Sequence, residues 1–231
     1  MAEICTRPAA PLAATRPLIL SLIAALTLAL AAGTARAHAN AQDMVRTAAT
    51  QAIDALERSR EELQANPAKV YDFVQEYLLP YFDFEYSSRL VLGRNWRNAS
   101  PEERERFQEA FQRTLIRGYG SAMLKYSDQE IIFLPYREDP GKDNATVKTE
   151  IDVGDSKPVA VDYNVRLVNG EWKVYDVIID GISVVVNYRG TFGAEIKRMG
   201  GLAPLIEKME ERNRSNTLDP VSDEFPAPGV D

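Results

Sequence analysis

The spacing of the apolar residues changes along this chain, and this change most restricts the fold. Before Asp128 they recur every three or four positions, as on one face of an amphipathic helix. After Asp128 they alternate with polar residues, and the helical spacing returns at about Ser183. Helices, then strands, then helices are typical of an α+β protein, in which helices cover an antiparallel sheet. The sequence therefore predicts an α+β fold with a four-stranded antiparallel sheet.

Six helices are expected from the periodic segments. The clearest helix start is at Ser100, where this residue is the N-cap, Pro101 occupies the first turn and Glu103 completes a capping box. Proline and glycine residues end several of the other segments. The expected ranges are 43–64, 69–79, 82–92, 101–125, 183–198 and 202–211.

Four strands are expected, at residues 130–135, 145–151, 158–168 and 171–180. Between the last two lies Asn169-Gly170, the dipeptide preferred in a two-residue type I′ hairpin turn. This turn sets the predicted pairing of the two strands. The expected pairs are Leu167 with Trp172, Val165 with Val174, Tyr163 with Asp176, and Val161 with Ile178.

Asp176 is the one polar residue that this pairing places on an apolar face, between Val174 and Ile178. A charge there is unfavourable unless it is hydrogen-bonded or paired. Asp176 is either a polar contact at the mouth of a ligand cavity or a structural acceptor for a tyrosine hydroxyl, an arginine or backbone N–H groups. We favour the structural interpretation. A β-bulge would instead turn the side chain outward.

The residue types favour a protein with a large apolar interior that binds a ligand over an enzyme. The segment from Tyr71 to Ile179 contains no Cys and no His, since the chain's only Cys is Cys5 and its only His is His38. This excludes a thiol nucleophile, an imidazole base and a Cys/His metal cluster from the segment. Of the 20 aromatic residues, 19 lie between residues 71 and 192, so the apolar interior is expected there.

The carboxylates leave one catalytic alternative open. The four acidic residues between Asp72 and Glu85 have no spacing that marks an acid/base pair, so a solvated helix face is the favoured interpretation. The remaining alternative is a hydrolase or isomerase on a cone-shaped α+β scaffold. It would use Asp176 with Tyr163 or Tyr175.

The first 37 residues have the pattern of a secretory signal peptide. Arg7 and Arg16 form a basic start, residues 18–32 are an apolar run, and residues 35–37 are a small-x-small cleavage site. The run is shorter than the roughly 20 apolar residues of a membrane span. We therefore expect cleavage after Ala37 and export to the periplasm, with no Cys after the run to carry a lipid anchor.

The charge and the tail set further limits. The net charge is −7 and the basic residues are interspersed with acids, which argues against nucleic-acid binding and against tight adhesion to anionic membranes. From Asn213 onward, Pro, Ser, Asp and Gly dominate, so residues 213–231 are expected to be a disordered tail.

Six uncommon runs follow one another along the chain: YFDFEY (81–86), RLVLGRNW (89–96), ASPE (99–102), WKVYDVIIDGIS (172–183), NYR (187–189) and GGL (200–202). In this order, and after an export signal, they resemble the MlaC family. These are periplasmic phospholipid-binding proteins of the Mla system, also called the toluene-tolerance family. The resemblance covers about residues 41–212, which is nearly the whole chain after the signal peptide.

The resemblance implies a soluble carrier that moves phospholipid across the periplasm and maintains the lipid asymmetry of the outer membrane. It implies two partners, an outer-membrane lipoprotein–porin complex and an inner-membrane ABC transporter complex with an MCE-domain ring. It also implies an apolar cavity between sheet and helices, with acyl tails inside and the headgroup exposed. No enzyme activity, metal or cofactor is implied, and bound phospholipid is the cargo. A purely structural assembly partner is a third interpretation of the chain.

The expected lipid-binding residues lie on two facing walls of this cavity. One wall is a single sheet face and the other is the capped helix that follows Ser100. The sheet face is expected to present Val147, Val161, Tyr163, Val165, Val174 and Ile178, and the helix Phe111, Leu115 and Tyr119.

Overall fold

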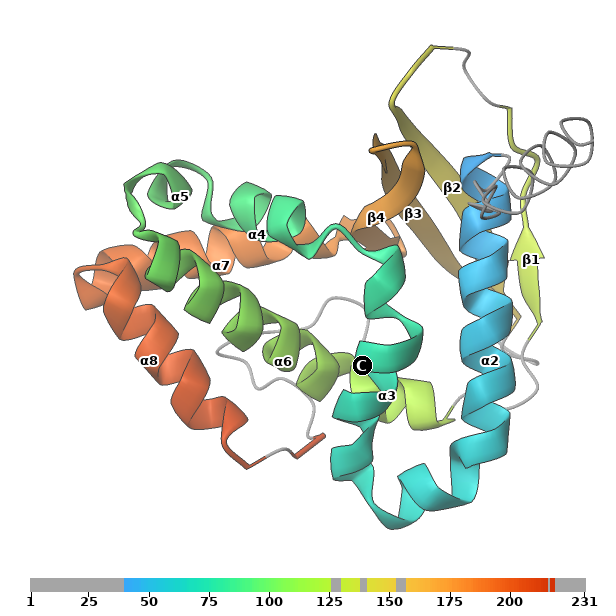
Figure 1. The fold of residues 1–231 in the computed structure, drawn as a ribbon, viewed down its shortest axis with the longest axis horizontal. Coiled ribbons are helices and arrows are strands. Elements are labelled where there is room, and N and C mark those ends of the chain that lie inside the picture. Colours follow the sequence, from blue (N-terminus) through green and yellow to red (C-terminus); the bar gives the residue numbers. More distant parts are fainter. Residues whose placement is uncertain (1–39, 126–129, 138–140, 153–156, 216, 219–231) are drawn as a thin grey trace, which may run out of the picture. The chain divides into compact units, whose positions relative to one another are not determined.

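The computed structural model describes residues 40–125, 130–137, 141–152, 157–215 and 217–218 (Figure 1). The predicted signal peptide, residues 1–37, lies outside these ranges, as do residues 219–231 of the predicted tail. Within the described ranges, no helix is both long enough and apolar enough to span a bilayer.

The helices follow the predicted ranges to within a few residues, with one addition. The short helix α5 forms directly after Gly93 and was not predicted. Two 3₁₀ turns, η2 (Pro67–Lys69) and η3 (Leu79–Tyr81), connect the early helices. The helices are α2 (Ala41–Ala65), α3 (Val70–Tyr77), α4 (Phe84–Leu92), α5 (Arg94–Asn98), α6 (Pro101–Lys125), α7 (Val184–Met199) and α8 (Leu202–Asn213).

Side-chain caps fix where the long helices begin. The backbone N–H of Ser100 donates to the Glu103 carboxylate at 2.8 Å, and the backbone N–H of Glu103 donates to the Ser100 hydroxyl at 3.1 Å. This is the predicted capping box at the start of α6. At the start of α2, Asn40 Oδ1 accepts from the backbone N–H of Asp43 at 2.9 Å. Loss of such a cap typically costs about 0.5–2 kcal/mol, so the caps define these starts strongly.

The sheet is antiparallel, as predicted, but it has five strands instead of four. Strand β5 is only two residues long and pairs with the end of β4 across the tight turn at Asp180-Gly181. Both turn residues have positive φ, 46° and 84°. The prediction began the next helix at about Ser183 and therefore left no room for this strand. In order across the sheet, the strands are β1 (Ile131–Phe133), β2 (Asn144–Ile151), β3 (Val159–Val168), β4 (Glu171–Ile179) and β5 (Ile182–Ser183).

The β3–β4 hairpin has the predicted turn and the predicted pairs next to it. Asn169 and Gly170 both have positive φ, 52° and 86°, as a type I′ turn requires. The observed pairs next to the turn include Leu167 with Trp172 and Val165 with Val174.

Beyond these pairs, β4 contains a bulge that changes the register. Val174 still pairs with Val165, but Asp176 pairs with Asn164, which leaves Tyr175 as an extra residue on β4. Side chains alternate between the two faces of a strand, so one inserted residue moves every later side chain to the other face. The predicted pairs Tyr163–Asp176 and Val161–Ile178 are therefore wrong, and the observed pairs are Tyr163–Val177 and Val161–Ile179.

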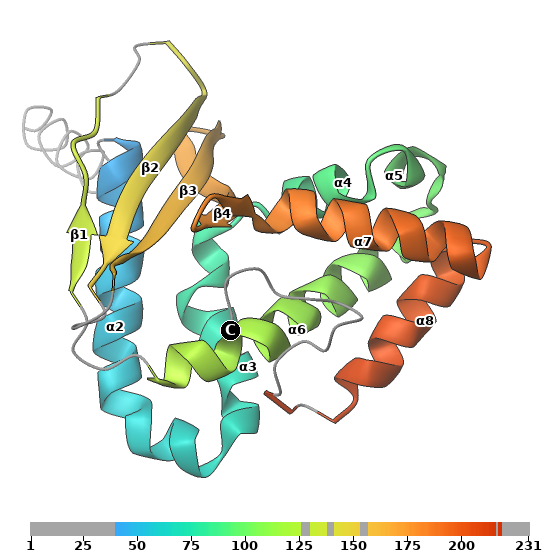
Figure 2. The ribbon, with the colours of Figure 1, turned by 180° about the vertical axis from the view of Figure 1, so that it is seen from behind.

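Helix α2 lies along one face of the sheet, as Figures 1 and 2 show from opposite sides. Met44 and Val45 of α2 form an apolar cluster with sheet residues. The amide of Gln42 donates to the Leu134 carbonyl oxygen at 3.0 Å, which ties α2 to the segment after β1. The buried sheet residues of this cluster are Val147, Val165, Trp172 and Val174.

The remaining helices form two further apolar clusters. Helices α4, α6, α7 and α8 meet around an aromatic group in which Phe111 packs against Phe107, Tyr188 and Phe192, with ring centroids 5.2–5.7 Å apart. The third cluster joins the second half of α2 to α3 and α6, and it includes Val70. The cavity described next lies where these clusters meet.

Candidate functional site

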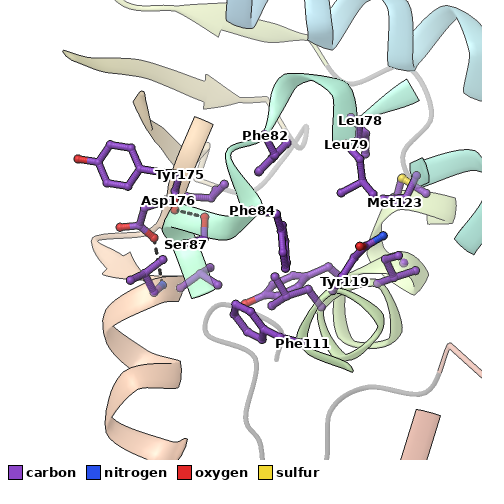
Figure 3. A pocket seen from close by; sticks show the side chains of 18 of the residues that line it. Leu78, Leu79, Phe82, Phe84, Ser87, Phe111, Tyr119, Met123, Tyr175 and Asp176 are labelled. Carbon is purple, nitrogen blue, oxygen red and sulfur yellow. Dashed lines mark hydrogen bonds between the residues drawn. The ribbon is translucent and has the colours of Figure 1, made fainter. Parts of the chain in front are cut away.

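A cavity of about 290 Å³ lies between α3, η3, α4, α6, β4 and the start of α7. Its wall is almost entirely apolar, and Figure 3 shows side chains from these elements pointing toward a common space. The apolar lining residues are Val74, Leu78, Leu79, Phe82, Phe84, Phe111, Leu115, Ile116, Gly120, Met123, Val177, Ile179, Val184 and Val185. The polar ones are Ser87, Gln112, Tyr119, Tyr175 and Asp176.

Phe82, in the connection between η3 and α4, and Phe84, the first residue of α4, both line the cavity. Phe84 packs on Phe111 of α6, with ring centroids 5.5 Å apart, and Figure 3 shows its ring directed toward that helix. Phe82 forms an isolated bridge with Val174 of β4. Asp83 lies between the two phenylalanines, and its backbone N–H donates to the Val174 carbonyl oxygen at 2.8 Å. The chain between η3 and α4 thus runs alongside β4 next to the bulge, and Phe82 and Phe84 on either side of Asp83 both line the cavity.

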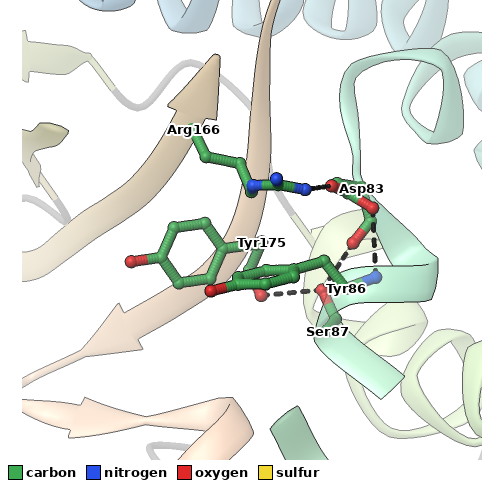
Figure 4. Close-up of polar contacts among 5 residues, drawn as sticks. All are labelled: Asp83, Tyr86, Ser87, Arg166 and Tyr175. Atoms are coloured by element: carbon green, nitrogen blue, oxygen red, sulfur yellow. Dashed lines mark hydrogen bonds and ion pairs between the residues drawn. The ribbon is translucent and has the colours of Figure 1, made fainter. Parts of the chain in front are cut away.

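A polar cluster connects the start of α4 to β3 and β4 (Figure 4). Asp83 caps α4 by accepting from the backbone N–H of Tyr86 at 3.0 Å, and it also forms an ion pair with Arg166. The Arg166 guanidinium lies 4.3 Å from the centre of the Tyr86 ring, which meets the Tyr175 ring edge-on at 5.3 Å. The Ser87 hydroxyl donates to the Tyr175 carbonyl oxygen at 2.7 Å. The bulge and the start of α4 are therefore joined as one unit.

Asp176 is a structural acceptor, as favoured from the sequence. The bulge turns it away from the apolar face that α2 covers, and its side chain is nevertheless buried. Its Oδ1 accepts from the backbone N–H of Val185 at 3.0 Å, and its Oδ2 accepts from the Ser183 hydroxyl at 2.7 Å and from the Asn164 amide at 3.4 Å. Ser183 in turn caps α7. The carboxylate therefore fastens the start of α7 to β4.

The residues around Asp176 do not form the catalytic site of the alternative hydrolase or isomerase. Both of its oxygens are engaged by donors, and Tyr163 is not part of the cavity wall. Figure 3 shows the Tyr175 ring directed away from the cavity, and burial, followed by Tyr86 and Asp176, raises the pKa of its hydroxyl. No group of three or more His, Cys, Asp or Glu side chains that could hold a metal ion occurs in the described ranges.

The structure brings together only one of the two predicted walls. Phe111, Leu115 and Tyr119 of α6 all line the cavity. The six predicted sheet residues do not, and whether any of the nine contacts a lipid stays a prediction. Val147, Val165 and Val174 are buried under α2, and Tyr163 packs against the same cluster. Val161 is buried on that same sheet face, whereas Ile178 lies on the opposite face because of the bulge.

The sheet contributes other residues, which the sequence analysis missed. After the bulge, Val177 and Ile179 line the cavity from β4, next to Val184 and Val185 of α7. Without the bulge at Tyr175, strict alternation along β4 places Val177 and Ile179 on the opposite sheet face, so the sequence pattern alone did not indicate them. The early residues Leu78, Leu79, Phe82 and Phe84 were also missed, although this segment is dense in large apolar side chains.

The chain is similar to proteins of one family over most of its length. The family model described as MlaC protein matches residues 46–211. Toluene tolerance protein ttg2D of Pseudomonas putida is 33% identical over 159 residues, which are 68% of this chain and 74% of that protein. The intermembrane phospholipid transport system binding protein MlaC of Haemophilus influenzae is 27% identical over 193 residues, 80% of this chain and 88% of that protein.

The fold is also similar to that of a solved structure. A phospholipid-binding protein from Ralstonia solanacearum, determined in complex with a phospholipid, superposes with a TM-score of 0.72 at 29% identity. The match covers 77% of this chain and 99% of that one.

Proposed function

Because the chain belongs to the MlaC family, we propose that it is a periplasmic carrier that binds phospholipid in the cavity between α4, α6 and β4. The observation that carries this proposal is the cavity itself, whose wall is apolar on nearly every side. The relative from Haemophilus influenzae is named as a phospholipid transport binding protein, and the similar solved structure holds a phospholipid. The chain is thus a binding protein and not an enzyme.

The apolar wall has the chemistry that an acyl chain needs. Each buried CH₂ group contributes about 0.8 kcal/mol, so exposing a 15-carbon chain to water costs on the order of 12 kcal/mol. The phenylalanine rings of Phe84 and Phe111 and the aliphatic side chains around them replace the membrane interior as the surroundings of the chain. A carrier must bind the tails about as well as a bilayer does, since transfer would otherwise stop at one membrane.

The route of the lipid is the finer part of the proposal. The predicted signal peptide in residues 1–37 and the word intermembrane in the name of the Haemophilus influenzae relative support a place between two membranes. We propose that the carrier exchanges lipid with an outer-membrane lipoprotein–porin complex and with an inner-membrane ABC transporter complex that has an MCE-domain ring. This exchange would maintain the lipid asymmetry of the outer membrane.

Mass spectrometry of organic extracts tests the binding step. Protein purified from the periplasm should carry diacyl phospholipid in a fixed molar ratio, and lipid-free protein should take labelled phospholipid from vesicles. A protein that is empty when purified and takes up no lipid from vesicles would overturn the proposal.

A vesicle assay tests the route. Transfer of labelled phospholipid by the protein should be faster to vesicles containing either membrane complex than to vesicles of the same lipid without protein. Equal rates to all three would leave a lipid-binding protein but remove the two complexes as partners.

A further inference from the structure

Two hydrogen-bond donors interrupt the apolar wall that α6 supplies to the cavity. The side-chain amide nitrogen of Gln112 and the hydroxyl of Tyr119 are buried, and neither atom has a hydrogen-bond partner in the described part of the chain. Both residues line the cavity. They lie seven positions apart, about two helical turns, so they share the face on which Leu115 and Ile116 also meet the cavity.

Two of the other three polar side chains of the wall, Ser87 and Asp176, already have protein partners, and the Tyr175 ring is directed away from the cavity (Figure 3). The Ser87 hydroxyl donates to the Tyr175 carbonyl oxygen at 2.7 Å, and both Asp176 oxygens accept from protein donors. A buried donor without a partner has lost its hydrogen bonds to water and gained none in the protein, which is unfavourable. Gln112 and Tyr119 therefore form a site for a ligand acceptor. A hydrogen bond to that acceptor would offset the free-energy cost of leaving the two buried donors unpaired.

The two donors define the chemical group that fits. An amide NH₂ can only donate, and burial, followed by the nearby Tyr188, raises the pKa of Tyr119, so its hydroxyl keeps its proton and can donate too. The matching group is an oxygen with free lone pairs. In a phospholipid, the ester carbonyl oxygens are the acceptors nearest to the acyl chains. The carboxyl group of a free fatty acid offers the same chemistry.

We propose that Gln112 and Tyr119 donate hydrogen bonds to the carbonyl oxygen at the head of an acyl chain and so set how deeply the chain enters the cavity. This proposal rests on the proposed function, because it requires a lipid in this cavity. An ether-linked chain has no carbonyl oxygen. The protein should therefore bind ester-linked phospholipid more tightly than the ether-linked analogue with the same headgroup and chain lengths.

Equilibrium binding to lipid-free protein tests this, with a diester phospholipid, its diether analogue and a free fatty acid of the same chain length as ligands. The unmodified protein should prefer the diester by about fivefold to tenfold for each hydrogen bond. Gln112→Met and Tyr119→Phe should each lose one such factor, and the double variant should bind both phospholipids equally. Tyr188→Phe is the matched control, since its hydroxyl is also buried without a partner but Tyr188 does not line the cavity. This variant should keep the preference.

The outcomes separate this proposal from the carrier function. Equal binding of diester and diether by the unmodified protein would overturn the proposal and leave the carrier function standing, and this comparison needs no variant. Binding of neither phospholipid would overturn both. Weakened binding of the fatty acid alone in the variants would support the two donors but assign the acceptor to a free carboxyl group instead of an ester.

Discussion

Asp176 connects two elements through a single carboxylate. It accepts hydrogen bonds from Val185 and Ser183 at the start of α7 while its own backbone belongs to β4. The negative charge also lies at the N-terminus of a helix, where the aligned peptide dipoles favour an anion. The residue therefore acts on stability, and through α7 on the position of the cavity wall.

Asp176→Asn should destabilise the protein by about 1–3 kcal/mol, because the amide has one acceptor oxygen and no charge where several donors converge. Urea unfolding measures this loss. Asp54→Asn, on the exposed side of α2, is the matched control and should leave stability unchanged. If the protein had a turnover activity that Asp176→Asn removed while the fold stayed intact, the carrier function would be contradicted.

At the scale of elements, Glu195 joins α7 to α8. Hydrogen bonding from Arg198, with a further contribution from Lys208 of α8, holds the pKa of Glu195 at about 2, below its ordinary value of 4.5. A carboxyl whose pKa is lower in the folded state stabilises the protein above its unfolded pKa and loses this effect as the pH falls toward the folded pKa. The contribution should therefore be complete above about pH 5 and disappear near pH 2.

Glu195→Gln should thus be less stable than the unmodified protein at pH 7, with a difference that shrinks between pH 4.5 and pH 2. Urea unfolding across this range gives the comparison. Glu211→Gln is the control, because its ion pair with Arg214 is largely exposed and should contribute little at any pH. A Glu195→Gln variant with an unchanged pH profile would contradict the role given to this contact.

The last residue of α8 and the chain after it also pack on other helices. The buried Asn213 amide donates to the Ala110 carbonyl oxygen at 2.8 Å, and the Tyr71 hydroxyl donates to the Thr217 carbonyl oxygen at 3.2 Å. Leu218 lies so close to Gly120 that a Cβ atom there would approach it to 2.9 Å. These contacts continue past Arg212, where the sequence placed the end of the folded domain.

Ending the chain after Arg212 should lower Tm by about 5 °C, since a loss of roughly 2 kcal/mol corresponds to this shift at this chain length. A chain ending after Leu218 keeps the contacts and is the matched control. Equal Tm values for the two truncated chains would show that this segment does not contribute to stability.

Helix starts and turns that depend on a few neighbouring residues were predictable from the sequence. The packing of helices against the sheet was not. The capping box at Ser100 and the Asn169-Gly170 turn act over a few residues, so both appear in the sequence as in the structure. The bulge at Tyr175 contacts α4 through the Ser87 hydroxyl, and the sequence around it has no glycine or other local signal. Likewise, no local pattern tells that α2 covers the sheet face that contains Val165. The cavity is therefore lined by the three predicted helix residues but by none of the six predicted sheet residues, and which of the nine contact lipid stays a prediction.

At the scale of the whole described molecule, the cavity occupies the junction of three apolar clusters. Phe111 and Leu115 belong to the aromatic helix cluster, Ile116 to the cluster of α3, and Phe82 to the cluster under α2. Residues of all three line the same space. A ligand in this cavity would therefore contact all three clusters. The interior of each single cluster is already filled by packed side chains.

Two tryptophan substitutions distinguish the cavity from close-packed core. Leu115→Trp should fold with nearly unchanged stability and carry less lipid, because the indole takes space from the acyl chain. Val165→Trp should lose about 1–3 kcal/mol or more through overpacking under α2, with lipid per folded molecule unchanged. Thermal unfolding and extracted lipid per protein measure both effects. The reverse pattern would move the lipid site to the sheet face under α2.

Photocrosslinking tests most directly where the lipid lies. The protein is loaded with a phospholipid that carries a photoreactive group in the middle of one acyl chain, and the crosslinked peptides are identified by mass spectrometry. The crosslinks should fall on α6 around Phe111 and Leu115 and on α4 around Phe84, which line the cavity. Crosslinks concentrated instead on Val147 and Val165 of the sheet face under α2 would contradict the assignment of the cavity as the lipid site.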